Sequence, residues 1–202
     1  MGRTPKVVED RREQILDAAI SVFAEKGFER ATNRDIAHAA GITAGLIYHY
    51  FKSKEELLRE AIERRSAVGL LRSIDETMFD LEPEAMLRGL IGRMLEIVEQ
   101  ERFVSLMRVY LPEAIHNARM LPMALGPIGE ATTSLKRYLA KKMDDGVLRK
   151  ADSAFASNFV LGAIMDLVLR RKVLHDSTVA KYTHEQIVDG VVTTILSGLL
   201  PR

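Results

Sequence analysis

Three helix starts lie close together in residues 32–57, and this spacing restricts the fold more than any other feature of the chain. A residue that favours the N-cap position stands at each start: Thr32, Thr43 and Ser53. Glu56 follows Ser53 by three positions, as in a capping box, and Asp35 follows Thr32 in the same way. Gly41 suits the left-handed backbone that ends a helix. The stretch therefore predicts two short helices joined by a glycine turn, with a third helix directly after them.

The rest of the chain also follows the helical period, and alternating runs of β-branched residues are missing. We therefore predict an all-α fold of about nine helices. Besides the two short helices joined by the glycine turn, helices are expected at residues 8–26, 53–78, 83–100, 103–117, 130–144, 153–174 and 183–200. Residues 120–129, rich in Met, Pro and Gly, are expected to connect two of them.

Composition excludes several classes of protein. The chain has no cysteine, so disulfides and thiolate metal sites are impossible, which fits a cytoplasmic protein. Residues 1–13 hold no apolar run, so no secretory signal is expected there. The longest apolar segment, residues 159–169, is interrupted by Asp166 and is shorter than the roughly 20 residues of a membrane span, so no membrane partner is expected. The net charge of +1 does not mark a nucleic-acid binder, so such a function must rest on local geometry.

The second short helix is expected to bury one side and expose the other. Ile47 is expected to pack on the apolar stripe of the first helix, at Ile15, Ala19 and Phe23. The opposite side then carries Ala44, Gly45, Tyr48 and His49. Small residues let a helix backbone approach base edges, and tyrosine and histidine can donate hydrogen bonds to phosphates or bases. This arrangement predicts a helix-turn-helix that binds double-stranded DNA in the major groove.

Free backbone amides at helix N-termini are a second source of DNA contacts, because they bind phosphate. Arg34 lies in the first turn of its helix, and so does Lys54, where a cation opposes the helix dipole. A phosphate between Lys54 and the amides would explain that lysine. Basic residues near the N-terminus are candidates for a flexible arm on the duplex: Arg3, Lys6, Arg11 and Arg12. Plain helical packing stays open as the alternative, because the same spacing also occurs without DNA.

Residues 10–58 closely resemble the N-terminal domain of the TetR family of transcriptional repressors. The resemblance is carried by RREQILDAAISVFAEKGFE, then T-x-x-D-IA-x-AAG, then GLIYHYF-x-SKEEL. It implies that the second and third helices meet the major groove, that the protein is a homodimer, and that a helical ligand-binding domain follows. Leu46 stands where many relatives have threonine, so no DNA contact is expected from that position. Geometry and resemblance together give the candidate DNA-contact set Thr32, Asn33, Arg34, Thr43, Ala44, Gly45, Tyr48, His49 and Lys54.

These observations predict a DNA-binding domain at residues 1–52 and a ligand-binding and dimerisation domain at residues 53–202. The expected function is repression by a dimer on a palindromic operator, with release by a small apolar effector and with no cofactor. The expected long helix at residues 53–78 would carry the signal between the two domains.

Two helices near the C-terminus are expected to form the dimer interface. Residues 155–174 and 187–200 carry apolar stripes wider than one face, with small residues beside them at Gly162, Gly190 and Gly198. One subunit does not offer enough partners to cover both stripes, so a four-helix interface between two subunits is predicted. A simple helix pair in the core of one subunit is the alternative.

Methionines cluster in the middle of the chain, and their flexible side chains adapt to varied apolar ligands. The candidate effector contacts are Met94, Phe103, Met107, Tyr110, Glu113, His116, Met123, Phe159 and Met165. Core packing explains the apolar members equally well. A solvated helix face is the alternative for the polar group that includes Arg108 and Asn117.

Two other classes of protein are alternatives. Glu113 and His116 have the Glu-x-x-His spacing of helical di-iron oxidases, which need a second such pair. The other histidines are His38, His49, His175 and His184, and none of them follows a glutamate by three positions. No metal site is therefore expected. A helical adaptor with no DNA partner would leave the face of Tyr48 and Lys54 unexplained.

Overall fold

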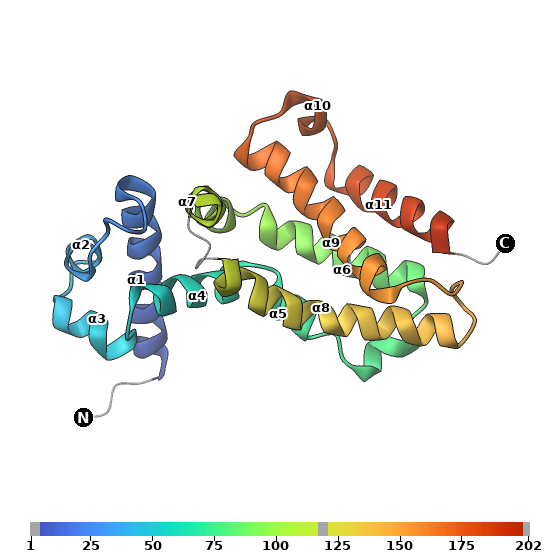
Figure 1. Cartoon of the computed structure of the whole chain (residues 1–202), viewed down its shortest axis with the longest axis horizontal. Coiled ribbons are helices and arrows are strands. Elements are labelled where there is room, and N and C mark those ends of the chain that lie inside the picture. The colour runs from blue at the N-terminus through green and yellow to red at the C-terminus, as the bar shows by residue number, and fades with distance from the viewer. Residues whose placement is uncertain (1–4, 117–120, 200–202) are drawn as a thin grey trace. The chain divides into compact units, whose positions relative to one another are not determined.

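The computed structural model describes residues 5–116 and 121–199, and the regular elements among them are all helical (Figure 1). Its α-helices are α1 (Pro5–Lys26), α2 (Asn33–Ala39), α3 (Ala44–Tyr50), α4 (Lys54–Arg65), α5 (Val68–Arg72), α6 (Pro83–Val98), α7 (Glu101–His116), α8 (Leu121–Asp144), α9 (Ser153–Val168), α10 (Ser177–Ala180) and α11 (His184–Leu199). A 3₁₀ turn at Glu76–Asp80 and a π turn at Leu169–Val173 complete the helical elements. The all-α class is confirmed, with eleven α-helices among the described residues where about nine were expected.

The chain folds as two compact units. Unit 1 comprises Met1–Arg65 and Glu101–Leu125, and unit 2 comprises Ser66–Gln100 and Gly126–Arg202. The predicted boundary between residues 52 and 53 separates a DNA-binding domain from a ligand-binding domain. It is a functional boundary, which a division into compact units does not test, so it stays a prediction.

Unit 1 holds the helix-turn-helix, and its core is completed by α7, a helix from much later in the chain. Ile47 is fully buried in one cluster with Ile15, Ala19 and Phe23 of α1, as the sequence predicts. The α7 members of the same cluster are Leu106, Val109 and Tyr110. Burial of each large aliphatic side chain stabilises the fold by about 1.5–3 kcal/mol. The helix-turn-helix therefore depends on α7 for part of its stability.

The helix ends around the motif follow the expected chemistry, with two exceptions. Thr32 and Asp35 form a complete capping box on α2, and Gly41 adopts a positive φ of 62° where the turn requires it. Thr43 stands at the N-cap of α3, but its side chain makes no capping hydrogen bond, contrary to expectation. The Ser53 Oγ accepts the Glu56 N–H at 3.2 Å, while the Glu56 carboxylate accepts the N–H of Lys52, one residue before the position that a capping box uses.

The single helix expected at residues 53–78 is wrong. α4 ends at Arg65, α5 begins only at Val68, and the 3₁₀ turn follows. The Ser66 Oγ accepts the Val68 N–H at 3.3 Å, which offers the backbone a local alternative to the helix. Arg65 is held back on α1 by an ion pair of 2.8 Å with Asp17. Both contacts favour a break at this point.

Residues 120–129 were expected to be a connection, but α8 already begins at Leu121. Pro122 lies in the first turn of α8, where its missing N–H removes no intrahelical bond. Proline and glycine content alone is therefore a poor guide to this segment.

Unit 2 is organised around α6, which packs on both α9 and α11 (Figure 1). Glu99, which caps α6, accepts bonds from two other elements: the Arg171 guanidinium of the π turn at 2.6 Å, and the His184 ring at the start of α11, also at 2.6 Å. Tyr138 of α8 is fully buried and donates its hydroxyl to the Leu81 carbonyl at 2.9 Å. Burial, together with the charge of Glu82, raises the pKa of Tyr138 above its usual value.

One helical segment among the described residues, Ser153–Val173, is long and apolar enough to cross a membrane by length and composition alone. This result differs from the expectation, which counted only residues 159–169. The segment carries Asp166, whose carboxylate pairs with Arg170 at 3.7 Å, and it ends in three basic residues. A single such helix is weak evidence for a membrane span, and an apolar face of this kind also suits a subunit interface.

The dependence of the motif on α7 gives a first prediction. Leu106→Ala, at a fully buried position, should destabilise unit 1 by about 2–5 kcal/mol. Ile115→Ala on the same helix removes a side chain that is 79% exposed and should change stability by no more than about 0.5 kcal/mol. Amide exchange of α1 peptides, measured against urea concentration, compares the two. Equal effects in α1 would contradict a shared core.

Candidate nucleic-acid interface

The second helix of the motif, α3, presents one side to the core and the other to solvent. Ile47 is 0% exposed, whereas its neighbour Tyr48 is 61% exposed. Gly45 and His49 are also exposed, and the His49 ring lies edge-on to Tyr50, with 5.2 Å between the ring centroids. Ala44 departs from the expectation, because it is half-buried and packs on the unit 1 core. The exposed side therefore consists of a glycine, followed one turn later by a tyrosine and a histidine.

Gly45 lies in the first turn of α3 and has open space beside it. A Cβ built at Gly45 would meet no atom within 4 Å. The absence of a side chain is therefore not required by packing within the described part of the chain. It does leave the backbone of the first turn of α3 open to a partner, together with the exposed Thr43.

The N-terminus of α2 forms the second part of the face. Arg34 is exposed in its first turn, and Asn33 is half-buried, with an Oδ1 atom that has no hydrogen-bond partner among the described residues. Asp35 accepts from the Thr32 N–H at 2.9 Å and pairs with Lys26 at 2.6 Å. The bonds from Lys26, followed by those from Thr32, hold the pKa of Asp35 well below its usual value.

Lys54 makes contacts within unit 1 that its position in the sequence did not indicate. Its Nζ donates to the Phe28 carbonyl at 2.7 Å and to the Glu29 carbonyl at 3.1 Å. The ammonium also lies 4.8 Å from the centre of the Phe28 ring. These contacts explain a lysine in the first turn of α4 without a phosphate. Sequence reasoning missed them because Phe28 is distant in sequence.

Two residues of the predicted flexible N-terminal arm, Arg11 and Arg12, make contacts within unit 1. Arg12 pairs with Glu60 of α4 and lies 4.8 Å from the centre of the Phe51 ring, so it is part of the fold. The bond from Glu60 raises the pKa of Arg12. Arg11 donates to Gln14 at 2.6 Å. Arg3 and the side chain of Lys6 lie outside the described residues.

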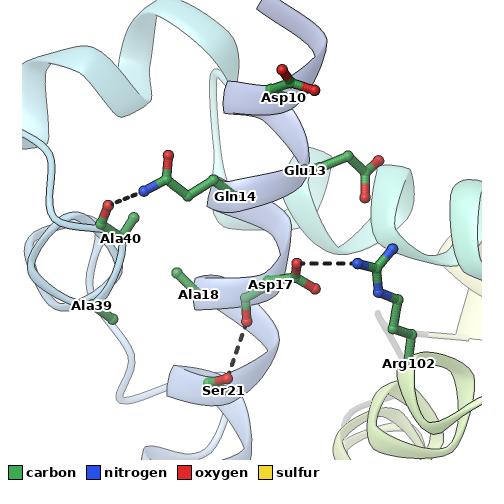
Figure 2. A pocket seen from close by; sticks show the side chains of 9 residues that line it. All are labelled: Asp10, Glu13, Gln14, Asp17, Ala18, Ser21, Ala39, Ala40 and Arg102. Carbon is green, nitrogen blue, oxygen red and sulfur yellow. Dashed lines mark hydrogen bonds and ion pairs between the residues drawn. The ribbon is translucent and has the colours of Figure 1, made fainter. Parts of the chain in front are cut away.

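A groove of about 690 Å³ on unit 1 has the wrong charge for DNA (Figure 2). Carboxylates of α1 line it, and Asp17 among them faces Arg102 of α7 at 3.9 Å. The Gln14 amide donates to the Ala40 carbonyl at 2.6 Å across the groove, which fixes the end of α2 on α1. Negative charge repels phosphate, so the exposed side of α3 is the better candidate for a DNA contact.

The candidate effector residues are divided between the two units. In unit 1, Phe103 and Tyr110 are buried and Met107 packs on the core. In unit 2, Met94 is buried and Met165 is half-buried, whereas Phe159 is 53% exposed on α9. The side chains of His116 and Met123 lie outside the described residues. The set stays a prediction.

The Glu113 carboxylate makes a hydrogen bond within unit 1 that the sequence did not indicate. Its Oε1 accepts the Phe28 N–H at 2.8 Å, from α7 to the loop between α1 and α2. No pattern in the sequence links positions 28 and 113. This bond gives the carboxylate a structural use, so neither an effector nor the di-iron alternative is needed to explain it.

An apolar groove of about 390 Å³ runs between α9 and α11 in unit 2. Phe155 and Phe159 stand exposed on α9, with their rings nearly parallel and 6.5 Å between centroids. Gly190 and Thr194 of α11 form part of the groove floor. The predicted pair of helices therefore does carry an apolar face that the described residues of one chain leave uncovered.

Two family models match the chain. One, described as bacterial regulatory proteins of the tetR family, covers residues 15–61. The other, described as the C-terminal domain of AefR-like transcriptional repressors, covers residues 85–198. The two matches account for both the helix-turn-helix and most of the remaining chain.

The curated relatives match chiefly in the N-terminal half. The HTH-type transcriptional repressor KstR2 of Mycolicibacterium smegmatis is 44% identical over 59 residues, 29% of each chain. KstR2 of Mycobacterium tuberculosis is 36% identical over 99 residues, 49% of this chain and 50% of its own length. The chain thus spans half or less of these relatives.

Solved structures match over nearly the whole chain. A TetR family transcriptional regulator from Pseudomonas syringae has a TM-score of 0.77 at 23% identity, covering 96% of this chain and 98% of its own. The SmeT–triclosan complex has a TM-score of 0.76 at 26% identity, covering 95% and 92%. FadR from Bacillus subtilis in complex with stearoyl-CoA has a TM-score of 0.73 at 23% identity, covering 92% and 98%. These likenesses establish the fold.

The capping contacts of α2 give a second prediction. Because the folded pKa of Asp35 is lowered, its stabilising effect is complete above the unfolded pKa of about 3.9 and is lost as the pH falls through the folded value. Asp35→Asn should therefore lower the melting temperature at pH 7, and the gap to wild type should shrink below about pH 4. Circular dichroism measured against pH tests this, with the exposed Asp10→Asn as control. A gap that stayed constant on acidification would contradict the role of the carboxylate charge.

Proposed function

The chain belongs to the TetR family of bacterial regulatory proteins, and from this we propose that it is a dimeric transcriptional repressor released from its operator by an apolar effector. The observation that carries the DNA-binding part is the contrast on α3 between buried Ile47 and exposed Tyr48. It gives the helix one side fixed by the core and one side free for a duplex. As a cytoplasmic regulator, the protein would meet DNA and effector in the same compartment.

The geometry supports direct DNA contacts from fewer residues than the sequence predicts. The first turn of α3, at Gly45, would approach base edges, because a backbone without a side chain can come closest. Tyr48 and His49 would donate to bases or phosphates. Thr32, Asn33 and Arg34 would place the α2 N-terminus on the phosphate backbone. Lys54 would support this face indirectly, through the carbonyls that it holds.

A dimer is proposed through α9 and α11. The groove between these helices and the exposed Phe155 and Phe159 would be covered by the same helices of a second subunit. The small residues Gly190 and Thr194 would let the helices approach closely. For a palindromic operator, the two copies of α3 must lie about 34–36 Å apart to enter successive major grooves.

The effector class rests on the relatives and on composition. Two structures of similar fold hold apolar or acyl compounds, triclosan and stearoyl-CoA. The methionines of α6 to α9 provide adaptable apolar side chains in this chain. We therefore propose a hydrophobic effector, either an acyl chain or a drug-like aromatic. To release DNA, it must bind the non-DNA-binding conformer more tightly than the DNA-binding one.

The DNA face gives a third prediction. In vitro selection from random duplexes should yield an operator, and Gly45→Leu should abolish specific binding to it while the fold is kept, since a Cβ at this site meets nothing. Gly89→Leu makes the same change at an exposed, equally open glycine of α6 and should bind like wild type. Fluorescence anisotropy with a labelled operator measures both. Wild-type affinity in Gly45→Leu would rule out the close approach of α3.

The dimer gives a fourth prediction. Gly190→Arg places a charged side chain in the α9–α11 groove at a position where the free subunit has room for it. Sedimentation should show a dimer at micromolar concentration for wild type and for Gly89→Arg, and a monomer for Gly190→Arg. A wild-type monomer, or a Gly190→Arg dimer, would contradict this interface.

A further inference from the structure

The peptide groups of Phe28 are held by side chains on both sides. Its N–H donates to Glu113 of α7 at 2.8 Å, and its carbonyl accepts from Lys54 of α4 at 2.7 Å. Its ring is buried against Phe23, with centroids 5.0 Å apart. A single residue of the loop between α1 and α2 is thus joined to three helices of unit 1.

This loop leads directly into the candidate DNA face. Only two residues lie between Phe28 and Ala31, which is buried, and Thr32 then caps α2. Gly27 begins the loop with a positive φ of 79°, and a Cβ there would come within 3.4 Å of the Glu113 carboxylate. The path of the backbone from α1 to α2 is therefore fixed around Glu113.

The connectivity of the chain makes α7 the element best placed to carry a change from unit 2. The chain crosses between the units at Arg65/Ser66, at Gln100/Glu101 and at Leu125/Gly126. The last two crossings lie before and after α7, and the first follows the end of α4, where the helix is interrupted. An unbroken helix from the DNA face into unit 2, which the sequence suggested as the carrier of the signal, is not present.

We propose that Glu113 is a positioning residue for DNA binding, which holds the loop between α1 and α2 through the Phe28 N–H and thereby sets the N-terminus of α2. A shift of α7 that breaks this bond would free the loop and weaken operator binding. The inference rests on the proposed function and adds to it the contact through which unit 2 acts on the DNA face. A bond between a carboxylate and a backbone N–H is charge-assisted and directional, so it reports small displacements of α7.

Core packing by α7 is the competing explanation of its effect on unit 1. That explanation assigns Glu113 no part in DNA binding beyond general stability. Three variants separate the two. Glu113→Ala removes the acceptor, Glu113→Gln keeps an acceptor oxygen at the same reach, and Glu101→Ala removes a carboxylate that is exposed at the start of the same helix. If Glu113→Ala does not fold, Glu113→Asp, one methylene shorter, takes its place.

The first measurement needs no DNA. Amide exchange of the peptide covering residues 27–32 should become about tenfold faster in Glu113→Ala, while α1 and α3 exchange as in wild type. Glu113→Gln and Glu101→Ala should stay within about twofold of wild type in this peptide. Unchanged exchange in Glu113→Ala overturns the proposal. Faster exchange throughout unit 1 also overturns it, because that result reports loss of stability alone.

The second measurement is operator affinity with triclosan or stearoyl-CoA as probe. Glu113→Ala should bind the selected operator about tenfold more weakly, and any release by the probe should be smaller than in wild type. Glu113→Gln should restore affinity to within about twofold. Faster exchange with unchanged operator affinity overturns the positioning role. If selection yields no operator, the proposed function fails by itself, and the exchange result alone decides whether Glu113 holds the loop.

A double-mutant cycle with Lys54→Ala tests whether the two contacts act on the same peptide. Both side chains hold Phe28, so their effects on exchange of residues 27–32 should not add. Additive effects would show that they act independently and would overturn the role assigned to Phe28.

Discussion

The burial of Ile47 determines how α3 is oriented in unit 1. Because this side chain lies in the core with Ile15 and Phe23, the rotation of α3 about its own axis is fixed. Tyr48 and Gly45 are exposed because they lie on the side of α3 opposite Ile47. The same core includes Leu106 and its neighbours on α7, so the helix proposed to contact DNA is stabilised by a helix from the later part of the chain.

Polar contacts fix the part of unit 1 that the apolar core does not position. The core fixes where α1, α3 and α7 lie in unit 1, while hydrogen bonds from Lys54, Glu113 and the Lys26–Asp35 pair fix the loop between α1 and α2. Apolar contacts are non-directional, whereas a hydrogen bond restricts both the distance and the angle between donor and acceptor. We therefore propose that a movement of α7 reaches the N-terminus of α2 through this loop.

The sequence predicted features that follow from neighbouring residues or from helical periodicity. The capping box of Thr32 and the positive φ of Gly41 depend on residues close by in the chain, and the burial of Ile47 follows from the matching apolar stripe of α1. The contacts of Lys54 and Glu113 do not, because their partners are set by tertiary folding over 26 and 85 positions. The break after Arg65 was missed for a related reason: helical periodicity continues through Ser66, and the ion pair with Asp17 on α1 is invisible in the pattern.

The most direct test of the account is a comparison of amide exchange in wild-type protein with the selected operator and with a scrambled duplex of equal length. A docked α3 predicts protection confined to the first turns of α2 and α3, around Arg34 and Gly45, with the operator and little with the scrambled duplex. Protection that falls instead on the acidic face of α1, at Asp10 and Asp17, or that does not differ between the two duplexes, would contradict it.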